Sequence, residues 1–154
     1  MMASFTRGPA VDDLKAFMEL SALLTGLYEI NSARDALLRE PVAAEYARRI
    51  RGVFPEQFGS LIALYKKFAT EDPKPAIDDQ LLGRLRNEQM FKDTEVISKQ
   101  IVNIWYFSQF KPSDDPKAPL FDGGYYELGA IWPLIKAHPI GFSDQRTGYW
   151  SDAP

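Results

Sequence analysis

The sequence predicts an all-α fold, a single-domain bundle of about five to seven helices followed by a long irregular aromatic C-terminal tail. Apolar residues recur at spacings of three and four through most of the first 110 positions, and prolines and glycines separate the periodic segments. No run shows sustained strand alternation. A chain of 154 residues that is 45% hydrophobic and 25% charged has the ordinary composition of one globular domain.

The first helices are predicted before residue 54. Asp12 and Asp13 suit the N-cap and first turn of a helix that Gly26 ends. Its apolar stripe consists of Leu14, Phe17, Met18, Ser21, Leu24 and Thr25. Residues 32–39 form a short amphipathic turn, after which Pro41 fits the first position of a new helix. The buried face of that helix is predicted to hold Val42, Tyr46, Ile50 and Val53.

Prolines divide the middle of the chain into further helices. Pro55 begins a helix with a strong apolar stripe, made of Phe58, Leu61, Ile62, Tyr65 and Phe68. The segment 71–75 holds two prolines and is the clearest internal break. The helix after it carries Ile77, Leu81, Leu82 and Leu85. Another begins near residues 93–95 and carries Val96, Ile97, Ile101, Ile104, Trp105 and Ser108.

The last third of the chain is irregular and aromatic. Within a single domain 1–154, the sequence predicts a flexible N-terminus (1–11), a helical core (12–110), a loop (111–124) and a last helix with an extended tail (125–154). The last helix covers residues 125–131, and Pro133 kinks or stops it. All three tryptophans lie in this third of the chain. Trp105 belongs to the apolar stripe of a helix and is predicted to be core, whereas Trp132 and Trp150 are interface candidates.

Composition excludes several classes of function. A net charge of −3 provides no basic field for nucleic acid, and the cluster of Arg48, Arg49 and Arg51 is better explained as a solvated helical face. Cysteine is absent, so the chain has no disulfide or thiolate site. No apolar run is long enough to span a membrane. Residues 1–9 lack an apolar leader region, although a removed leader would leave the same pattern.

No motif predicts catalysis, a cofactor site or a metal site in this chain. His138 is the only histidine, and no second imidazole or thiolate exists to complete a metal site. The acidic pairs at 12–13, 78–79 and 114–115 lack calcium-loop spacing, so capping and solubility explain them better. Gly123-Gly124 lacks the Lys-Ser/Thr of a phosphate loop. An enzyme that uses His138 with a nearby carboxylate stays as a minor alternative.

Four segments carry a resemblance to a known family. They are Phe17-Met-Glu-Leu-Ser-Ala-Leu-Leu-Thr-Gly26, Ile101-Val-Asn-Ile-Trp-Tyr106, Tyr126-Glu-Leu-Gly-Ala-Ile-Trp132, and the closing His138-Pro-Ile-Gly141 with Gly148-Tyr-Trp-Ser-Asp-Ala-Pro154. In this order they resemble the "LSxxLTG", "IxxLWYxG" and "W…HPxG…GxW…P" motifs of the small subunit of bacterial membrane-associated FAD-dependent sugar and polyol dehydrogenases, the sorbitol and fructose dehydrogenase type. The chain departs from the pattern at Phe107-Ser108-Gln109, where the family has Gly after Trp-Tyr.

The resemblance implies a non-catalytic accessory subunit. Such a subunit binds a glucose–methanol–choline-type flavoprotein that holds the FAD, helps it mature and carries it through the twin-arginine export route. A multihaem cytochrome c subunit is a further partner, and no nucleic acid is expected. The location is then periplasmic, although the chain carries no twin-arginine leader; the alternative is cytoplasmic. The predicted partner contacts are Tyr106, Tyr125, Tyr126, Trp132, His138, Phe142, Tyr149 and Trp150. A stand-alone helical adaptor or regulator that uses the same tail is the alternative function.

Overall fold

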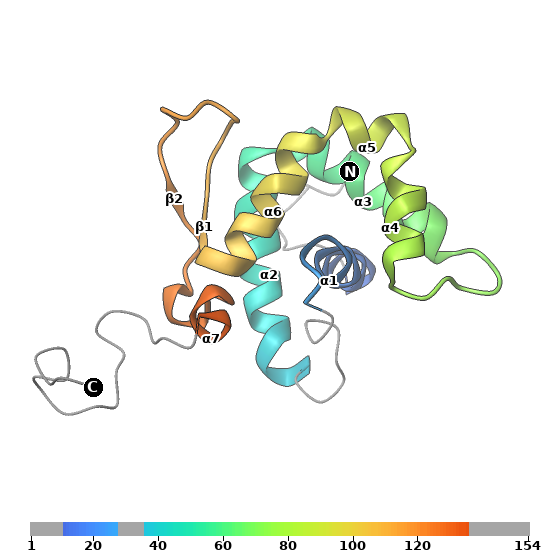
Figure 1. Ribbon diagram of the computed structural model, residues 1–154, viewed down its shortest axis with the longest axis horizontal. Helices are drawn as coiled ribbons and strands as arrows, with labels where there is room; N and C mark the ends of the chain where they lie inside the picture. The colour runs from blue at the N-terminus through green and yellow to red at the C-terminus, as the bar shows by residue number, and fades with distance from the viewer. Residues whose placement is uncertain (1–10, 28–35, 136–154) are drawn as a thin grey trace, which may run out of the picture.

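The all-α fold predicted from the sequence is confirmed by a computed structural model, which describes residues 11–27 and 36–135. Helices dominate this part of the chain, and a single small hairpin interrupts them (Figure 1). The elements are α1 (Val11–Thr25), α2 (Ala36–Val53), α3 (Pro55–Ala69), α4 (Asp79–Arg86), α5 (Gln89–Asp93), α6 (Glu95–Phe107), β1 (Gln109–Phe110), β2 (Phe121–Asp122), the 3-10 helix η2 (Tyr126–Leu128) and α7 (Ile131–Leu134).

Helix α1 is the central helix of the bundle. It contacts α2, α3, α4 and α6, and Figure 1 shows it end-on with these helices around it. Every residue from position 16 to position 23 is buried, so α1 has no solvent-facing stripe in that stretch. Two polar residues, Glu19 and Ser21, are therefore buried together with the apolar ones. The sequence predicted an amphipathic α1, and encirclement by four helices is what buries its polar face.

The core is built around aromatic rings from three helices. Trp105 of α6 is 3% exposed, so its predicted core position is confirmed. The Trp105 ring stacks on the ring of Phe17 of α1 with centroids 6.5 Å apart. The rings of Trp105 and of Tyr46 on α2 form a T-shaped pair with centroids 4.9 Å apart. Such pairs add to the free energy already gained by burying the rings. Trp105 therefore joins α1, α2 and α6 at one point.

Pro41 lies inside α2, and the prediction that it begins a helix is wrong. Helix α2 starts at Ala36, five residues earlier, and runs without a break to Val53. Proline lacks a backbone N–H, so this position cannot donate to the carbonyl of Leu37. The tertiary packing of Val42, Ala43 and Tyr46, all buried, holds the helix through this position. Part of the predicted turn, residues 32–35, lies outside the described residues.

The helix starts predicted at Pro55 and near residues 93–95 are confirmed, whereas Ile77, predicted to lie on the helix after the break, precedes α4. Pro55 is the first residue of α3. The segment 71–75 is the break between α3 and α4, and the Asp78 side chain caps α4 by accepting a hydrogen bond from the Leu81 N–H at 3.1 Å. Helix α6 begins at Glu95 as predicted, whereas the short helix α5 before it was not predicted separately.

A two-stranded hairpin was not predicted from the sequence. β1 and β2 pair antiparallel with Phe110 opposite Phe121, and their rings lie 5.5 Å apart. The predicted loop 111–124 is thus the long connection of this hairpin together with β2. Each strand has two residues, which is too short for any alternation of polar and apolar residues to be visible.

The predicted helix over 125–131 is also wrong, because it divides into η2 and α7. Between them the Ala130 N–H donates to the carbonyl of Trp105 at 3.0 Å, which takes the chain out of a helical path. Gly129 lies against α6 so closely that an added Cβ would be 2.7 Å from the Tyr106 carbonyl oxygen. Pro133 was predicted to kink or stop that helix, but it lies within α7. A tertiary contact with α6 overrides the local helical pattern here.

Candidate functional site

Four of the predicted contact residues meet where α6 ends. Tyr106 is on α6, Tyr125 and Tyr126 follow the hairpin, and Trp132 is on α7. Figure 1 shows α7 near the end of α6, and the hydrogen bond from the Ala130 N–H to the Trp105 carbonyl holds the chain between η2 and α7 against that helix. The other four predicted residues, His138, Phe142, Tyr149 and Trp150, lie outside the described residues. The structure therefore places half of the predicted contacts in one region of the bundle.

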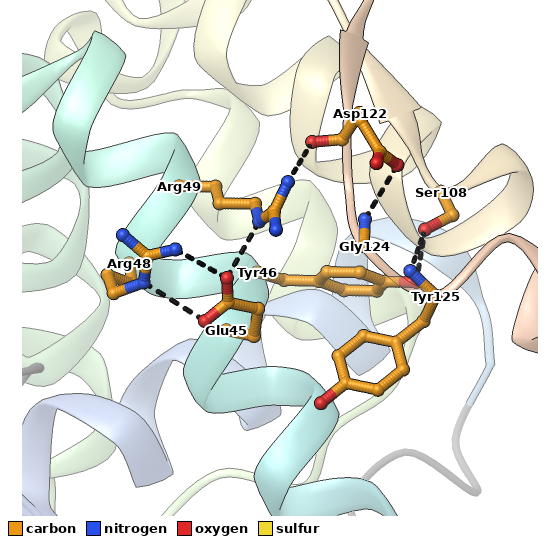
Figure 2. A network of polar contacts seen from close by, with 8 residues as sticks. All are labelled: Glu45, Tyr46, Arg48, Arg49, Ser108, Asp122, Gly124 and Tyr125. Carbon is orange, nitrogen blue, oxygen red and sulfur yellow. Dashed lines mark hydrogen bonds and ion pairs between the residues drawn. The ribbon is translucent and has the colours of Figure 1, made fainter.

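Ser108 turns the chain from α6 into the hairpin. It adopts a left-handed conformation with φ 52° and is fully buried. Its Oγ accepts hydrogen bonds from the Tyr46 hydroxyl at 3.1 Å and from the Tyr125 N–H at 2.9 Å (Figure 2). Burial raises the pKa of Tyr46 to about 12, so its hydroxyl stays a donor at neutral pH. One buried serine therefore fixes both the start of the hairpin and the position of Tyr125.

The same turn requires Gly123. Its N–H donates to the Ser108 carbonyl at 2.6 Å. A Cβ at this position would lie 2.7 Å from the Ser108 carbonyl oxygen and equally close to its Oγ. Gly124 follows with φ +98°, a conformation that favours glycine. The Gly123-Gly124 pair is thus a structural requirement of the hairpin.

A charged network ties the hairpin to α2. Arg49 donates from Nε to Glu45 at 2.8 Å and from Nη1 to the Asp122 carbonyl at 2.7 Å. Arg48 also binds Glu45, and Figure 2 shows both guanidinium groups directed at that carboxylate. The Asp122 carboxylate accepts from the Gly124 N–H at 2.8 Å. Arg49 therefore contributes to the packing of the hairpin, while Arg48 lies on the exposed face predicted from the sequence.

This network predicts a pH-dependent stability. The hydrogen bond from Arg48 is the largest cause that lowers the pKa of Glu45 to about 2; partial burial opposes it, and Arg49 adds to it. The folded-state pKa is thus below the unfolded value near 4.5, so the stabilisation is present above pH 4.5 and declines as the pH falls towards 2. We expect Glu45→Gln to lower the free energy of unfolding by about 1 kcal/mol at pH 6 and by less at pH 3. Urea denaturation at both pH values measures this, and an equal difference at the two would contradict it.

The aromatic side chains in this region are half-buried, and those of Tyr106 and Trp132 donate hydrogen bonds to backbone carbonyls. The Tyr106 hydroxyl donates to the Thr25 carbonyl at 2.9 Å, at the end of α1. The Trp132 indole N–H donates to the Tyr126 carbonyl at 3.0 Å, and the two rings meet edge-on at 5.3 Å. Tyr125 packs edge-on against Tyr46 at 6.0 Å. These residues form the frame of the region and present only part of each ring to solvent.

Exposed aliphatic and aromatic residues flank this frame. Phe107 is 46% exposed, Leu128 54% and Ile135 57%. We call the surface formed by Tyr106, Phe107, Tyr125, Tyr126, Leu128, Trp132 and Ile135 the α6–α7 surface. Phe107, Leu128 and Ile135 were not among the predicted contacts, because Phe107 lies on a regular helix and the other two are aliphatic. The position of Phe107 off the apolar stripe of α6 was a signal that it faces outward.

A buried ion pair at the other side of α1 was also missed. The Glu19 carboxylate is 3% exposed and accepts from the Tyr65 hydroxyl at 2.9 Å and from the Lys74 ammonium at 2.7 Å. Burial is the largest cause that raises the pKa of Tyr65, and the Glu19 charge adds to it. Lys74 reaches Glu19 from the segment between α3 and α4. This cluster fastens that segment to the central helix.

The described residues provide little else for chemistry. Across positions 11–27 and 36–135, no group of three or more His, Asp or Glu side chains is arranged to hold a metal ion. No helix in the same ranges is long and apolar enough to cross a bilayer. What this part of the chain offers is apolar and aromatic area on a rigid frame, which suits binding to another protein.

The chain was compared with protein-family models, curated proteins and solved structures. No family model, curated protein or solved structure matches it. The function therefore has to be inferred from the residues and their arrangement.

Proposed function

We propose that this chain is a non-catalytic accessory subunit that binds another protein through the α6–α7 surface. The observation that carries the proposal is the exposure of Phe107, Leu128 and Ile135 beside a frame of half-buried, hydrogen-bonded aromatic residues. Apolar groups held on a rigid frame lose little conformational freedom on binding, which is what a stable interface requires.

The more specific proposal is that the partner is the FAD-containing catalytic subunit of a sugar or polyol dehydrogenase, which this chain helps to mature. Three of the four motif segments that carry the family resemblance lie in contact; the fourth is outside the described residues. Tyr106, of the second motif, bonds the carbonyl of Thr25, of the first. The Ala130 N–H, of the third, bonds the carbonyl of Trp105. Motifs far apart in sequence that meet in space are expected of a shared structural unit.

Backbone conformation at two motif positions supports the same proposal. Gly26 closes the first motif segment and has φ +74°. Ser108 stands where the family motif has glycine, and its φ is 52°. Positive φ is the conformation that glycine adopts without strain. Both of these positions, where the family motifs have glycine, thus have positive φ in this chain. Position 26 is glycine, whereas position 108 is serine, whose two hydrogen bonds offset the strain of its left-handed conformation.

In this proposal the FAD and the oxidation belong to the partner, a flavoprotein of the glucose–methanol–choline type. A multihaem cytochrome c subunit completes the complex, and the location is periplasmic. Co-expression of this chain with a flavoprotein of this type from the same source, followed by affinity purification, tests the proposal. We expect the two proteins to co-purify and the flavin content of the flavoprotein to fall when this chain is omitted. Unchanged flavin content and activity without it would refute the maturation role.

Charge placed on the α6–α7 surface should weaken the complex. We expect Phe107→Glu, and separately Leu128→Glu, to weaken binding of the flavoprotein by about tenfold or more, because a carboxylate would be desolvated at the interface. Met90→Glu on α5 is the matched control, since Met90 is 45% exposed and Phe107 46%. Binding is measured by surface plasmon resonance, with thermal unfolding as a check on folding. Equal losses in all three variants would place the interface elsewhere.

A further inference from the structure

An open pocket of about 400 Å³ lies between α6 and the chain that follows β1. Its walls include Gln100 and Asn103 of α6 and Lys111 and Ser113 of the hairpin connection. Lys99 and Asp114 also line it. Nothing in the sequence singled out this pocket, because its two walls are brought together only by the hairpin. Its lining is rich in hydrogen-bond donors.

Gln100 is the feature that points to a ligand. It is 3% exposed, and its Oε1 accepts two hydrogen bonds, from the Lys111 N–H at 2.7 Å and from Asn103 Nδ2 at 3.3 Å. The backbone donor determines the orientation of the amide, because only the oxygen can accept from it. The amide nitrogen then has two N–H donors, and no described residue accepts a hydrogen bond from them. The amide nitrogen itself is not enclosed, so its N–H groups open onto the pocket, where an acceptor on a ligand can take the place of water.

The charges around the pocket favour an anionic acceptor. The Lys111 ammonium bonds a carbonyl, that of Pro116 at 3.2 Å, and among the described residues it has no carboxylate partner. Lys99 bonds Asp114 at 3.2 Å and is 3.7 Å from Glu95. Asp114 thus shows that a carboxylate fits beside Lys99 at this pocket. Asp114 and Glu95 already neutralise much of the Lys99 charge, so the Lys111 ammonium and the open Gln100 amide are the groups that match one further carboxylate.

We propose that this pocket binds a carboxylate, supplied by an Asp or Glu side chain of the protein partner. Lys99, Asn103 and Phe107 follow each other at intervals of four on α6, so the pocket and the exposed Phe107 share one helix face. The pocket is therefore continuous with the α6–α7 surface. The carboxylate chemistry rests on the pocket alone, whereas its assignment to the partner rests on the proposed function.

An NMR titration of the full ¹⁵N-labelled chain tests the site. The two probes are acetate and a short blocked peptide with one glutamate, each at constant ionic strength and with chloride as the reference. We expect the Gln100 side-chain NH₂ signals to shift and saturate with both probes, and the peptide to bind more tightly because it also contacts the pocket walls. Acetate binding as tight as peptide binding would overturn the assignment to a polypeptide side chain. No saturable shift with either probe would overturn the site.

Three substitutions should change the affinity for the glutamate peptide in different directions. Gln100→Glu keeps the acceptor for the Lys111 N–H but replaces the free donors with a negative charge, so we expect about tenfold weaker binding or more. Asp114→Asn removes the carboxylate that bonds Lys99 within this chain, so peptide binding should tighten about threefold. Lys117→Gln is the charge-matched control in the same connection outside the pocket, and it should change binding by less than about twofold. If Lys117→Gln weakens binding as much as Gln100→Glu, which changes the net charge by the same amount, only the net charge matters and the proposal fails.

The titration uses this chain alone, so it can fail independently of the proposed function. Saturable peptide binding without co-purification of the flavoprotein would retain the pocket and refute the proposed partner. Co-purification without any effect of Gln100→Glu would retain the partner and refute the pocket as its contact.

Discussion

Gly123→Ala is expected to lower the free energy of unfolding by about 2–3 kcal/mol. The added Cβ would lie 2.7 Å from the Ser108 carbonyl oxygen, which is part of the backbone and cannot rotate away. Relief requires the hairpin to move from the end of α6, and this breaks the hydrogen bond from the Gly123 N–H to that carbonyl. The position of Tyr125, fixed by the neighbouring bond to Ser108, should change as well. Urea denaturation measures the loss, and the Tyr125 amide signal reports the shift.

Gly83→Ala is the control for this prediction. Gly83 lies in α4, and an added Cβ there meets nothing within 4 Å. Alanine is the better helix former, so this change should raise the free energy of unfolding by about 0.5–1 kcal/mol. Two substitutions of the same chemical type should therefore act in opposite directions. A similar effect at both positions would show that the close approach of Gly123 to Ser108 is not important.

Lys74→Met should destabilise the protein by about 2 kcal/mol. It leaves the Glu19 carboxylate, 3% exposed, with the Tyr65 hydroxyl as its remaining described donor. Removing one partner of a buried ion pair costs more than the pair itself contributes, and the 46% exposure of Lys74 moderates the loss. The segment between α3 and α4 should also become more accessible to proteases, because Lys74 fastens it to α1. Thermal and urea unfolding give the stability change.

The double variant Lys74→Met with Glu19→Gln separates charge from packing. A neutral amide at position 19 can still accept from Tyr65, so most of the lost stability should return. Lys92→Met, on the exposed side of α5, serves as the control for losing a lysine and should have an effect within about 0.5 kcal/mol. If the double variant is no more stable than Lys74→Met alone, the unpaired charge is not the cause.

The predicted helices from α3 to α6 were correct where the signals are local. Pro55 fixes a helix start through its own ring, and Asp78 caps α4 three residues before its partner N–H. The apolar stripe from Ile97 to Trp105 is buried as predicted. Pro41 was misassigned because packing of the rest of α2 outweighs the one missing hydrogen bond. The hairpin was missed because two-residue strands have no pattern of their own.

The candidate site was only partly predictable. Composition identified Tyr106, Tyr125, Tyr126 and Trp132, and the structure places them together where α6 ends. It did not identify Phe107, Leu128 or Ile135, because exposure is a property of the packed bundle. Gln100 was not identified from the sequence; it is buried beside the hairpin connection, where the Lys111 N–H donates to its side chain.

The sequence by itself determined the all-α class, most helix boundaries and the aromatic character of the region around α7. These depend on periodicity, proline and capping, which act over a few residues. The tertiary structure alone decided the burial of Glu19, the break at Gly129 and the donor-rich pocket at Gln100. Each of these depends on groups that are far apart in the chain and meet only when α1 is surrounded and the hairpin returns to α6. The local sequence pattern thus specifies the helices, whereas the contacts between distant parts of the chain determine which groups the surface presents for binding.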